Sequence, residues 1–428
     1  MDLKKEIKLR DLLPKRGSKP ASPAAEQAAP GEEQTVVQPP AKKRSFSFAR
    51  KAKEPGQPKA PKTPKTPKPA RARKTSRQKR LVGLKIGGSQ LAAARVVNNG
   101  YPELVQVARA SLEAGIVVGG ELREPEALAE ALKLFFKDNK LPKQGVRLGI
   151  ASNRIGVRTF DIGGIDDPKQ LENAIRFRAQ ETLPIPLEEA VLDYQVLGET
   201  LDEEGSPVRR VLLVVAYRDL VDRYVAACKK AGIKLAGVDL EAFALLRALG
   251  ERAADAGNAA IVVTSVGYDR STLAVSNGET CEFTRIIEWG GLNLNVAIAR
   301  ALDMAPSEVE DVKRSISLLE SAETMEGLDP EKAAKVRTAV HEELQSFARE
   351  VVSSLQFYQG QPGSLGIGEI ILTGGTAEMP GIDAELGRLI GVRVRAGDPL
   401  SRVKLGKKFI ADDQVGSLAV AIGLGIEA

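Results

Sequence analysis

The chain contains the same local pattern twice, and this duplication constrains the fold more than any other feature. Leu81–Val97 reads as an apolar strand, a glycine turn and a second apolar strand, and Ala259–Val275 repeats that order. Short apolar runs that flank glycine are typical of buried strands joined by tight turns. Because further strands and helices follow each copy, the pattern predicts two α/β units of related construction.

Another glycine turn lies late in the chain, within Ile370–Ile382. The apolar run at its start predicts a buried strand, Thr373–Thr376 predicts a turn with little side-chain bulk, and Asp383–Ile390 predicts a helix. Adjacent glycines let backbone N–H groups approach a ligand closely. This order favours a phosphate- or nucleoside-binding edge, and a plain strand-to-helix turn is the alternative interpretation.

The periodicity between these turns predicts the other elements. Pro125–Asp138 has the apolar spacing of an amphipathic helix, and Val146–Ala151 reads as a strand that returns to the first sheet. Arg154–Ala231 predicts a β-α-β-β-α unit without convergent polar residues, which indicates a structural or partner-binding insertion. Ser307–Leu319 and Pro330–Phe357 are predicted to be helical.

These elements divide the chain into six parts. They are a docking segment (1–16), a disordered basic linker (17–80), a first lobe (81–153, completed by 233–257), an inserted subdomain (154–232), a second lobe (258–290, completed by 365–428) and a helical subdomain of the second lobe (291–364). A chain of 428 residues has room for about three domains of ~150 residues.

The charge of the chain is divided between the N-terminal tail and the rest. Residues 1–80 contain 23 Lys and Arg against 7 Asp and Glu, whereas the remaining residues contain 39 against 49. The tail also holds half of the 24 prolines and few apolar residues, so Gly17–Arg80 is expected to be disordered. Its charge suits either a solvated tether or contact with nucleic acid or an anionic membrane.

Composition excludes several kinds of site. Cys228 and Cys281 imply no disulfide framework, and with His341 as the single histidine we expect neither a histidine-based zinc site nor a Ser-His-Asp triad. No apolar run approaches the ~18–20 residues that span a bilayer. Charges interrupt Leu3–Leu13, where a signal peptide would have its apolar core. We therefore expect a cytoplasmic protein without a metal site.

Five features in the right order resemble the type IV pilus assembly protein PilM family, which is similar to the cell-division protein FtsA and belongs to the actin-like ATPase superfamily. The features are A-Q-E-T-L-P-I-P-L-E-E-A-V-L-D-Y-Q-V-L at Ala179–Leu197, V-D-L-E-A-F-A-L-L-R-A at Val238–Ala248, T-R-I-I-E-W-G-G at Thr284–Gly291, E-D-V-K at Glu310–Lys313 and L-T-G-G at Leu372–Gly375. The resemblance covers about Leu81 to Leu400. It implies a two-lobed actin-like ATPase fold of the α/β class, with an FtsA/PilM-type inserted subdomain.

The resemblance also implies a location, partners and a cofactor. A protein of this family lies at the cytoplasmic face of the inner membrane, binds the cytoplasmic tail of the membrane protein PilN, and holds ATP between its lobes. Other pilus assembly platform proteins and self-association are further expectations. The implied nucleotide-binding residues are Gly87, Gly88, Ser89, Gly267, Asp269, Ser271, Thr272, Gly290, Gly291, Lys313, Gly374, Gly375 and Thr376. For each glycine pair a plain turn is the alternative, and for Lys313 a solvated helix face.

Two positions depart from the family pattern. The resemblance places an aspartate just before Ile-Gly in each hairpin turn, and this chain has Lys85 and Ser265 there. Mg²⁺ prefers carboxylate and water ligands in octahedral geometry, and a charged lysine competes with the metal for the phosphate charge. Phosphoryl transfer depends almost wholly on such positioning. We therefore expect weak or metal-independent ATP binding and negligible hydrolysis, with no catalytic residue.

Three functions compete on this basis. A cytoplasmic scaffold of a type IV pilus or related secretion platform is favoured by the resemblance. An active ATPase or kinase-like enzyme of the same fold is disfavoured by Lys85 and Ser265. A nucleic-acid-associated protein would depend on the basic tail, and deletion of residues 1–80 would abolish its binding.

The first residues of the chain are the last feature with a regular apolar pattern. Ile7, Leu9, Leu12 and Leu13 precede Pro14 and partly resemble the I-N-L-L-P tail with which PilN docks onto PilM. Burial of each Leu or Ile side chain contributes about 1.5–3 kcal/mol before ordering costs. We expect this segment to dock, either on a partner or into the chain's own PilN-type groove, and a frayed helical end is the alternative.

Overall fold

The computed structural model describes residues 80–163, 165, 167–182, 186–201, 207–251, 257–319, 328–407, 409 and 415–427. The expected docking segment with Ile7, Leu9, Leu12 and Leu13, and the expected basic linker, lie outside the described residues. Among the described residues, the helices are too short or too polar to cross a membrane.

The first sheet has the strand order β10-β6-β1-β2-β3-β16. Its strands are β1 (Arg80–Ile86), β2 (Gln90–Asn99), β3 (Tyr101–Ser111), β6 (Gln144–Ile150), β10 (Lys234–Leu240) and β16 (Lys404–Leu405). β1 and β2 form an antiparallel hairpin, β2 pairs with β3 in the same way, and β6 and β10 extend the other side in parallel. β1 is buried because both faces of the sheet are covered.

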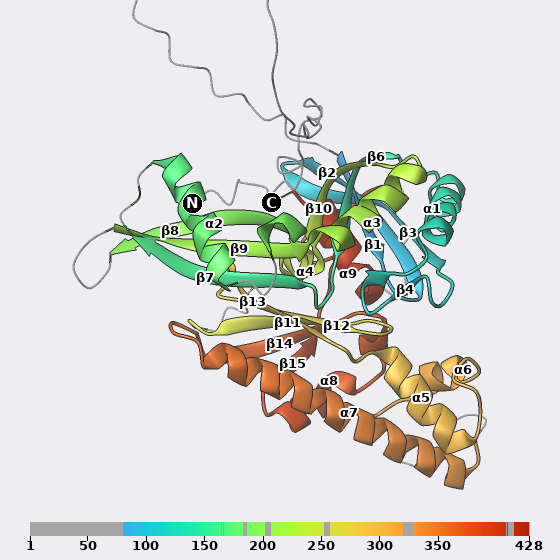
Figure 1. The fold of residues 1–428 in the computed structure, drawn as a ribbon. Coiled ribbons are helices and arrows are strands. Elements are labelled where there is room, and N and C mark those ends of the chain that lie inside the picture. Colours follow the sequence, from blue (N-terminus) through green and yellow to red (C-terminus); the bar gives the residue numbers. More distant parts are fainter. Residues whose placement is uncertain are drawn as a thin grey trace, which may run out of the picture. The chain divides into compact units, whose positions relative to one another are not determined.

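The second sheet, in the order β13-β12-β11-β14-β15, repeats the topology of the first five strands β3-β2-β1-β6-β10 and, among the described residues, has no counterpart of β16. Its strands are β11 (Ala260–Val266), β12 (Ser271–Ser276), β13 (Cys281–Ile287), β14 (Ile367–Thr373) and β15 (Val394–Ala396). β11 pairs antiparallel with β12 and parallel with β14, as β1 does with β2 and β6. The duplication predicted from the two glycine patterns is therefore present in the fold, and Figure 1 shows the two sheets.

Helices α4 (Glu241–Leu249) and α9 (Ala419–Gly425) pack together between the two sheets. Ala244, Leu245 and Ala248 of α4 share a buried cluster with Val263 of the second sheet and Leu424 of α9. α9 also packs against β1 and β2. The small residues of α9 allow this close approach to both sheets.

A three-stranded sheet, β7-β9-β8, interrupts the first unit. Its elements are β7 (Ile155–Gly163), α2 (Pro168–Thr182), β8 (Ala190–Leu201), β9 (Pro207–Tyr217) and α3 (Arg218–Lys230), in the predicted β-α-β-β-α order. On one face of β9, the odd-numbered residues Val211 and Leu213 pack against α2. On the other face, Leu212 and Val214 belong to the core of the first sheet. Strand alternation thus joins the insertion to the first lobe. The domain boundaries stay predictions.

The remaining helices cover the outer faces. They are α1 (Pro125–Asp138), α5 (Gly291–Leu302), α6 (Glu310–Ser315), α7 (Pro330–Gln359) and α8 (Ile382–Ile390). α5 packs along α7, and Trp289, just before α5, stacks on Phe347 of α7 with ring centroids 4.3 Å apart.

The predicted helix Ser307–Leu319 is wrong in its extent, because α6 is confined to Glu310–Ser315. The chain becomes extended at Ile316, whose side chain is 1% exposed in the core of the second unit. Leu318 N–H then donates to the carbonyl of Pro380 at 2.8 Å. Burial of Ile316 and this tertiary hydrogen bond override the helical pattern.

Candidate functional site

The two hairpin turns have the same backbone hydrogen bond. Gly87 N–H donates to the Gln90 carbonyl at 2.9 Å, and Gly267 N–H donates to the Arg270 carbonyl at 3.0 Å. This equivalence pairs Ser89 with Asp269 in the two turns. The first turn, G-G-S-Q, carries no charged side chain, whereas the second, G-Y-D-R, carries an aromatic and two charged ones.

Both turns line one cavity of about 590 Å³. Twelve of the residues singled out from the sequence contribute to its wall. They are Lys85, Gly87, Gly88, Ser89, Ser265, Gly267, Asp269, Thr272, Gly291, Lys313, Gly375 and Thr376. The sequence thus identified residues that the fold brings together from both sheets. A role in nucleotide binding stays a prediction at this point.

Three of the predicted residues support the wall from behind. Ser271 is fully buried and its hydroxyl donates to the carbonyl of Trp289 at 2.7 Å. Gly374 has φ +99°, and a side chain there would collide with the carbonyl of Val266. A side chain at Gly290 would likewise collide with the carbonyl of Tyr268. These positions fix the path of the backbone, and they are absent from the cavity lining.

The backbone N–H groups at the amino terminus of α5 already have hydrogen-bond acceptors within the protein. Gly291 N–H donates to the Gly267 carbonyl at 2.9 Å, and Leu292 N–H donates to the Tyr268 carbonyl at 2.8 Å. Gly290 N–H donates to the Asn293 side chain at 3.1 Å. Free N–H groups make a helix start an anion site, and in this structure the N–H groups of Gly290 and Gly291 already have acceptors. The bonds of Gly291 and Leu292 attach α5 to the second turn.

Four charged residues meet at the base of the cavity, namely Lys85, Glu241, Asp269 and Arg270. Arg270 Nη1 donates to Asp269 Oδ1 at 3.0 Å, and Arg270 Nη2 lies 3.9 Å from Glu241 Oε1. The Glu241 and Arg270 side chains are 3% and 7% exposed. Burial lowers the pKa of the Lys85 ammonium, and the nearby Glu241 carboxylate opposes that effect.

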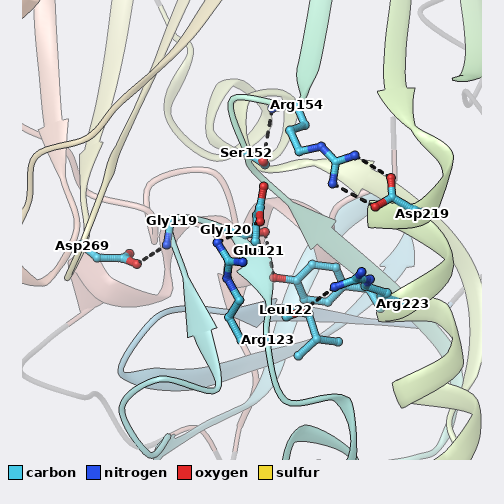
Figure 2. A network of polar contacts seen from close by, with 11 residues as sticks. Gly119, Gly120, Glu121, Leu122, Arg123, Ser152, Arg154, Asp219, Arg223 and Asp269 are labelled. Carbon is cyan, nitrogen blue, oxygen red and sulfur yellow. Dashed lines mark hydrogen bonds and ion pairs between the residues drawn. The ribbon is translucent and has the colours of Figure 1, made fainter. Parts of the chain in front are cut away.

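Asp269 also bonds across the cavity to the first unit. Its Oδ2 accepts a hydrogen bond from Gly119 N–H at 2.7 Å, which Figure 2 shows. A side-chain carbon added to Gly88 would lie 3.0 Å from the same carboxylate, so the carboxylate lies directly over the first glycine turn. The Asp269 side chain is 12% exposed.

Gly119 belongs to the turn between β4 (Val117–Val118) and β5 (Glu121–Leu122). Gly119 and Gly120 have φ of +58° and +80°, values that glycine adopts at little cost. The Gly120 carbonyl accepts from the Tyr224 hydroxyl of α3 at 3.1 Å. In the same network Arg154 makes a bidentate ion pair with Asp219, at 2.6 and 3.0 Å, which joins the start of the insertion to the start of α3 (Figure 2).

A second group of charged residues that lines the cavity lies on α6. Lys313 and Asn295 donate to Glu310 Oε2 at 2.7 and 2.9 Å, and Arg314 donates to Oε1 at 3.1 Å. Burial raises the pKa of Glu310, but these hydrogen bonds outweigh burial and lower it to about 2. Lys313 therefore lies at the cavity with a carboxylate partner, and Thr376, whose hydroxyl donates to the Gly267 carbonyl at 3.1 Å, lies nearby.

The donor set fits an anionic organic ligand better than a divalent cation. Lys85 and Arg270 place two cationic groups beside the carboxylates of Asp269 and Glu241, where a bound Mg²⁺ would be repelled. In the described part of the chain, no cluster of three or more His, Cys, Asp or Glu residues could hold a metal. The cavity thus combines glycine turns with cationic side chains, and a nucleotide as its ligand stays a prediction.

Sequence reasoning missed Glu241, Arg270 and Gly119. Glu241 begins α4 directly after the parallel strand β10, and ligands in open α/β sheets bind at the carboxyl ends of strands. Gly119-Gly120 directly follows the apolar run Ile116–Val118, and a Gly-Gly pair after such a run is a signal for a two-residue hairpin. No comparable signal marked Arg270, because its role depends on the proximity of Glu241 from the other unit.

Comparison with known proteins agrees with this architecture. The profile of the family described as type IV pilus assembly protein PilM matches residues 83–428. FtsA of Escherichia coli strain K12 is 24% identical over 368 residues, covering 77% of this chain and 86% of FtsA. FtsA of Bacillus subtilis strain 168 is 23% identical over 218 residues, covering 48% and 47%. The solved PilM–PilN type IV pilus biogenesis complex superposes with a TM-score of 0.68 at 24% identity, covering 81% of this chain and 97% of the matched one.

Two duplicated sheets that enclose a cavity at their glycine turns define a protein of the actin-like ATPase fold, with an insertion in the first unit. Within that class, the match over residues 83–428 shows that the chain belongs to the type IV pilus assembly protein PilM family.

Proposed function

We propose that this protein is a scaffold of a type IV pilus assembly platform, located at the cytoplasmic face of the inner membrane. Its first role is to bind the cytoplasmic tail of a PilN-like membrane protein. The observation that supports this role is the family match over residues 83–428, together with the likeness to a structure of PilM in complex with PilN.

The inserted subdomain is the proposed partner-binding part. One face of its sheet is continuous with the core of the first lobe through Leu212 and Val214. A partner tail bound to the inserted subdomain is therefore coupled to the first lobe through this shared core. Its helix α2 exposes Phe177, which is 65% exposed between two arginines. An exposed aromatic side chain of this kind is typical of contact surfaces.

The second proposed role is binding of a nucleotide without efficient hydrolysis. The cavity has glycine turns and cations, but Lys85 and Ser265 occupy the positions at which carboxylates would organise a metal-bound phosphate. We infer that a nucleotide acts here as a structural ligand that stabilises the association of the two lobes.

Calorimetry with the full chain and a synthetic PilN-like N-terminal peptide tests the first role. We expect binding by the unaltered protein and weaker binding by Phe177→Ser. Leu134→Ser is the matched control, because Leu134 is 57% exposed but lies on α1 of the first lobe. Absence of binding to any tail of the platform proteins, with the chain folded, would refute the scaffold role.

The second role is tested by binding of fluorescent ADP in EDTA and in Mg²⁺, followed by a phosphate-release assay with ATP. We expect similar affinity in both buffers and no turnover above background. Efficient Mg²⁺-dependent hydrolysis by the unaltered protein contradicts the proposal and supports the enzyme interpretation.

A further inference from the structure

The contacts of Asp269 have a consequence for access to the cavity. Its carboxylate comes from the second hairpin turn, lies over Gly88 of the first turn, and accepts the Gly119 N–H at 2.7 Å. It is 12% exposed. A carboxylate is therefore held at the place in the first turn where backbone N–H groups would otherwise meet an anionic ligand.

The two turns make this arrangement asymmetric. Their backbone hydrogen bonds are equivalent, so Asp269 is the counterpart of Ser89. The first turn presents small residues, whereas the second inserts a negative side chain into the first. Because like charges close together repel strongly in a partly buried site, a phosphate group and the Asp269 carboxylate cannot occupy the first turn together.

The same side chain joins the two lobes. Asp269 contacts Gly119 of the first unit, and its neighbour Arg270 lies 3.9 Å from Glu241 of that unit. Arg270 also donates to Asp269 at 3.0 Å and so orients the carboxylate at this position. Release of Asp269 would remove a hydrogen bond between the lobes as well as a negative charge from the first turn.

We propose that Asp269 is an intramolecular latch, which fastens the second hairpin turn to the Gly119–Gly120 turn and competes with the phosphate of an incoming nucleotide. The second part of this inference rests on the proposed nucleotide role of the cavity. Nucleotide entry then requires Asp269 to leave Gly119, and the Gly119–Gly120 turn, which also holds Tyr224 of α3, is the element that reports this release.

Two measurements on the full chain separate the latch from the nucleotide role. Hydrogen–deuterium exchange of residues 115–123 without nucleotide reports on the hydrogen bond between Asp269 and Gly119. We expect at least about tenfold faster exchange of the Gly119 amide within this segment for Asp269→Ala, since the Asp269 carboxylate is the acceptor of that N–H. Asp269→Asn retains an acceptor oxygen and should show a smaller change. Asp222→Ala, which removes an exposed carboxylate of α3, should show none.

Binding of fluorescent ADP in EDTA measures the competition. We expect Asp269→Ala and Asp269→Asn to bind at least about tenfold more tightly than the unaltered protein, because both remove the negative charge from the first turn, and Asp222→Ala to bind equally. Unchanged exchange in Asp269→Ala, or weaker ADP binding in both Asp269 variants, overturns the latch. If no variant binds ADP while the exchange of residues 115–123 increases as expected, the fastening is supported and the nucleotide role of the cavity is refuted.

Discussion

The two hairpin turns have one backbone design and opposite chemistry. Each closes with a hydrogen bond from its first glycine, 2.9 Å in the first turn and 3.0 Å in the second. The first turn carries no charged side chain, whereas Asp269 of the second turn places its carboxylate over the first turn and accepts a hydrogen bond from Arg270. Duplication therefore conserves the path of the chain, while the side chains decide which turn can receive a ligand and which turn projects into the other.

The strands that lead to these turns also differ. Gly83 of β1 occupies the place that Val263 holds in β11, two residues before Lys85 and Ser265. A side-chain carbon at Gly83 would lie 2.0 Å from the carbonyl of Ala421 in α9. Val263 instead fills a buried cluster with α4 and α9. The shared helix layer therefore approaches β1 more closely, and only a glycine permits that contact.

The largest effect we expect is the loss of this close contact in Gly83→Ala. The added methyl group must displace the backbone of α9, and the free energy of unfolding should fall by about 3 kcal/mol or more. Gly237→Ala is the matched control, because Gly237 lies in β10 of the same sheet with open space around it. Urea unfolding of both variants measures the difference, and equal stabilities would contradict the predicted contact.

The second expected effect is on metal-dependent binding. Lys85→Asp combined with Ser265→Asp restores a carboxylate to each strand end and removes a cation from the cavity wall. ADP should then bind about tenfold more tightly in Mg²⁺ than in EDTA, a difference of about 1.4 kcal/mol. Lys85→Met is the control, since it removes the cation without adding a metal ligand. A double variant that binds ADP identically in both buffers would show that other groups exclude the metal.

The sequence was sufficient for the architecture because the fold depends on repeated local patterns. Apolar runs and glycines in Leu81–Val97 and Ala259–Val275 are enough to specify two hairpins. The site was predicted less completely. Gly290 and Gly291 matched a phosphate-binding pattern, but the Gly291 amide donates to the Gly267 carbonyl and the Gly290 amide donates to the Asn293 side chain. Contacts between units, such as Asp269 with Gly119, follow from how two folded sheets meet and have no local sequence signal.

A third, smaller effect concerns how each hairpin is supported. Ser271→Ala removes the hydrogen bond to the Trp289 carbonyl and leaves a buried acceptor, so the free energy of unfolding should fall by about 1 kcal/mol. Ser89→Ala should have no measurable effect, because Ser89 lies at the cavity and its hydroxyl makes no hydrogen bond within the described residues. Thermal unfolding monitored by Trp289 fluorescence compares the variants. Equal losses would mean that the first turn is held by its side chains as well.

The smallest effect concerns the charge of Lys85, whose counterpart in the second strand is the neutral Ser265. Burial lowers the pKa of Lys85 below its ordinary value, so the folded protein releases this proton more easily than the unfolded chain. Between the lowered pKa and about 10.4, the unfolded state binds more protons, and stability should rise with pH as the penalty for burying the charge disappears.

The Lys85→Met variant has no charge at this position and therefore lacks the penalty for burying one. Its stability should exceed that of the unaltered protein at neutral pH by about 1 kcal/mol or less, and the advantage should shrink at alkaline pH. Lys234→Met, at an exposed position in β10, controls for loss of a lysine. Urea unfolding between pH 7 and the alkaline limit of the native state measures these stabilities. If Lys85→Met is less stable than the unaltered protein at neutral pH, Glu241 needs the Lys85 ammonium as its partner.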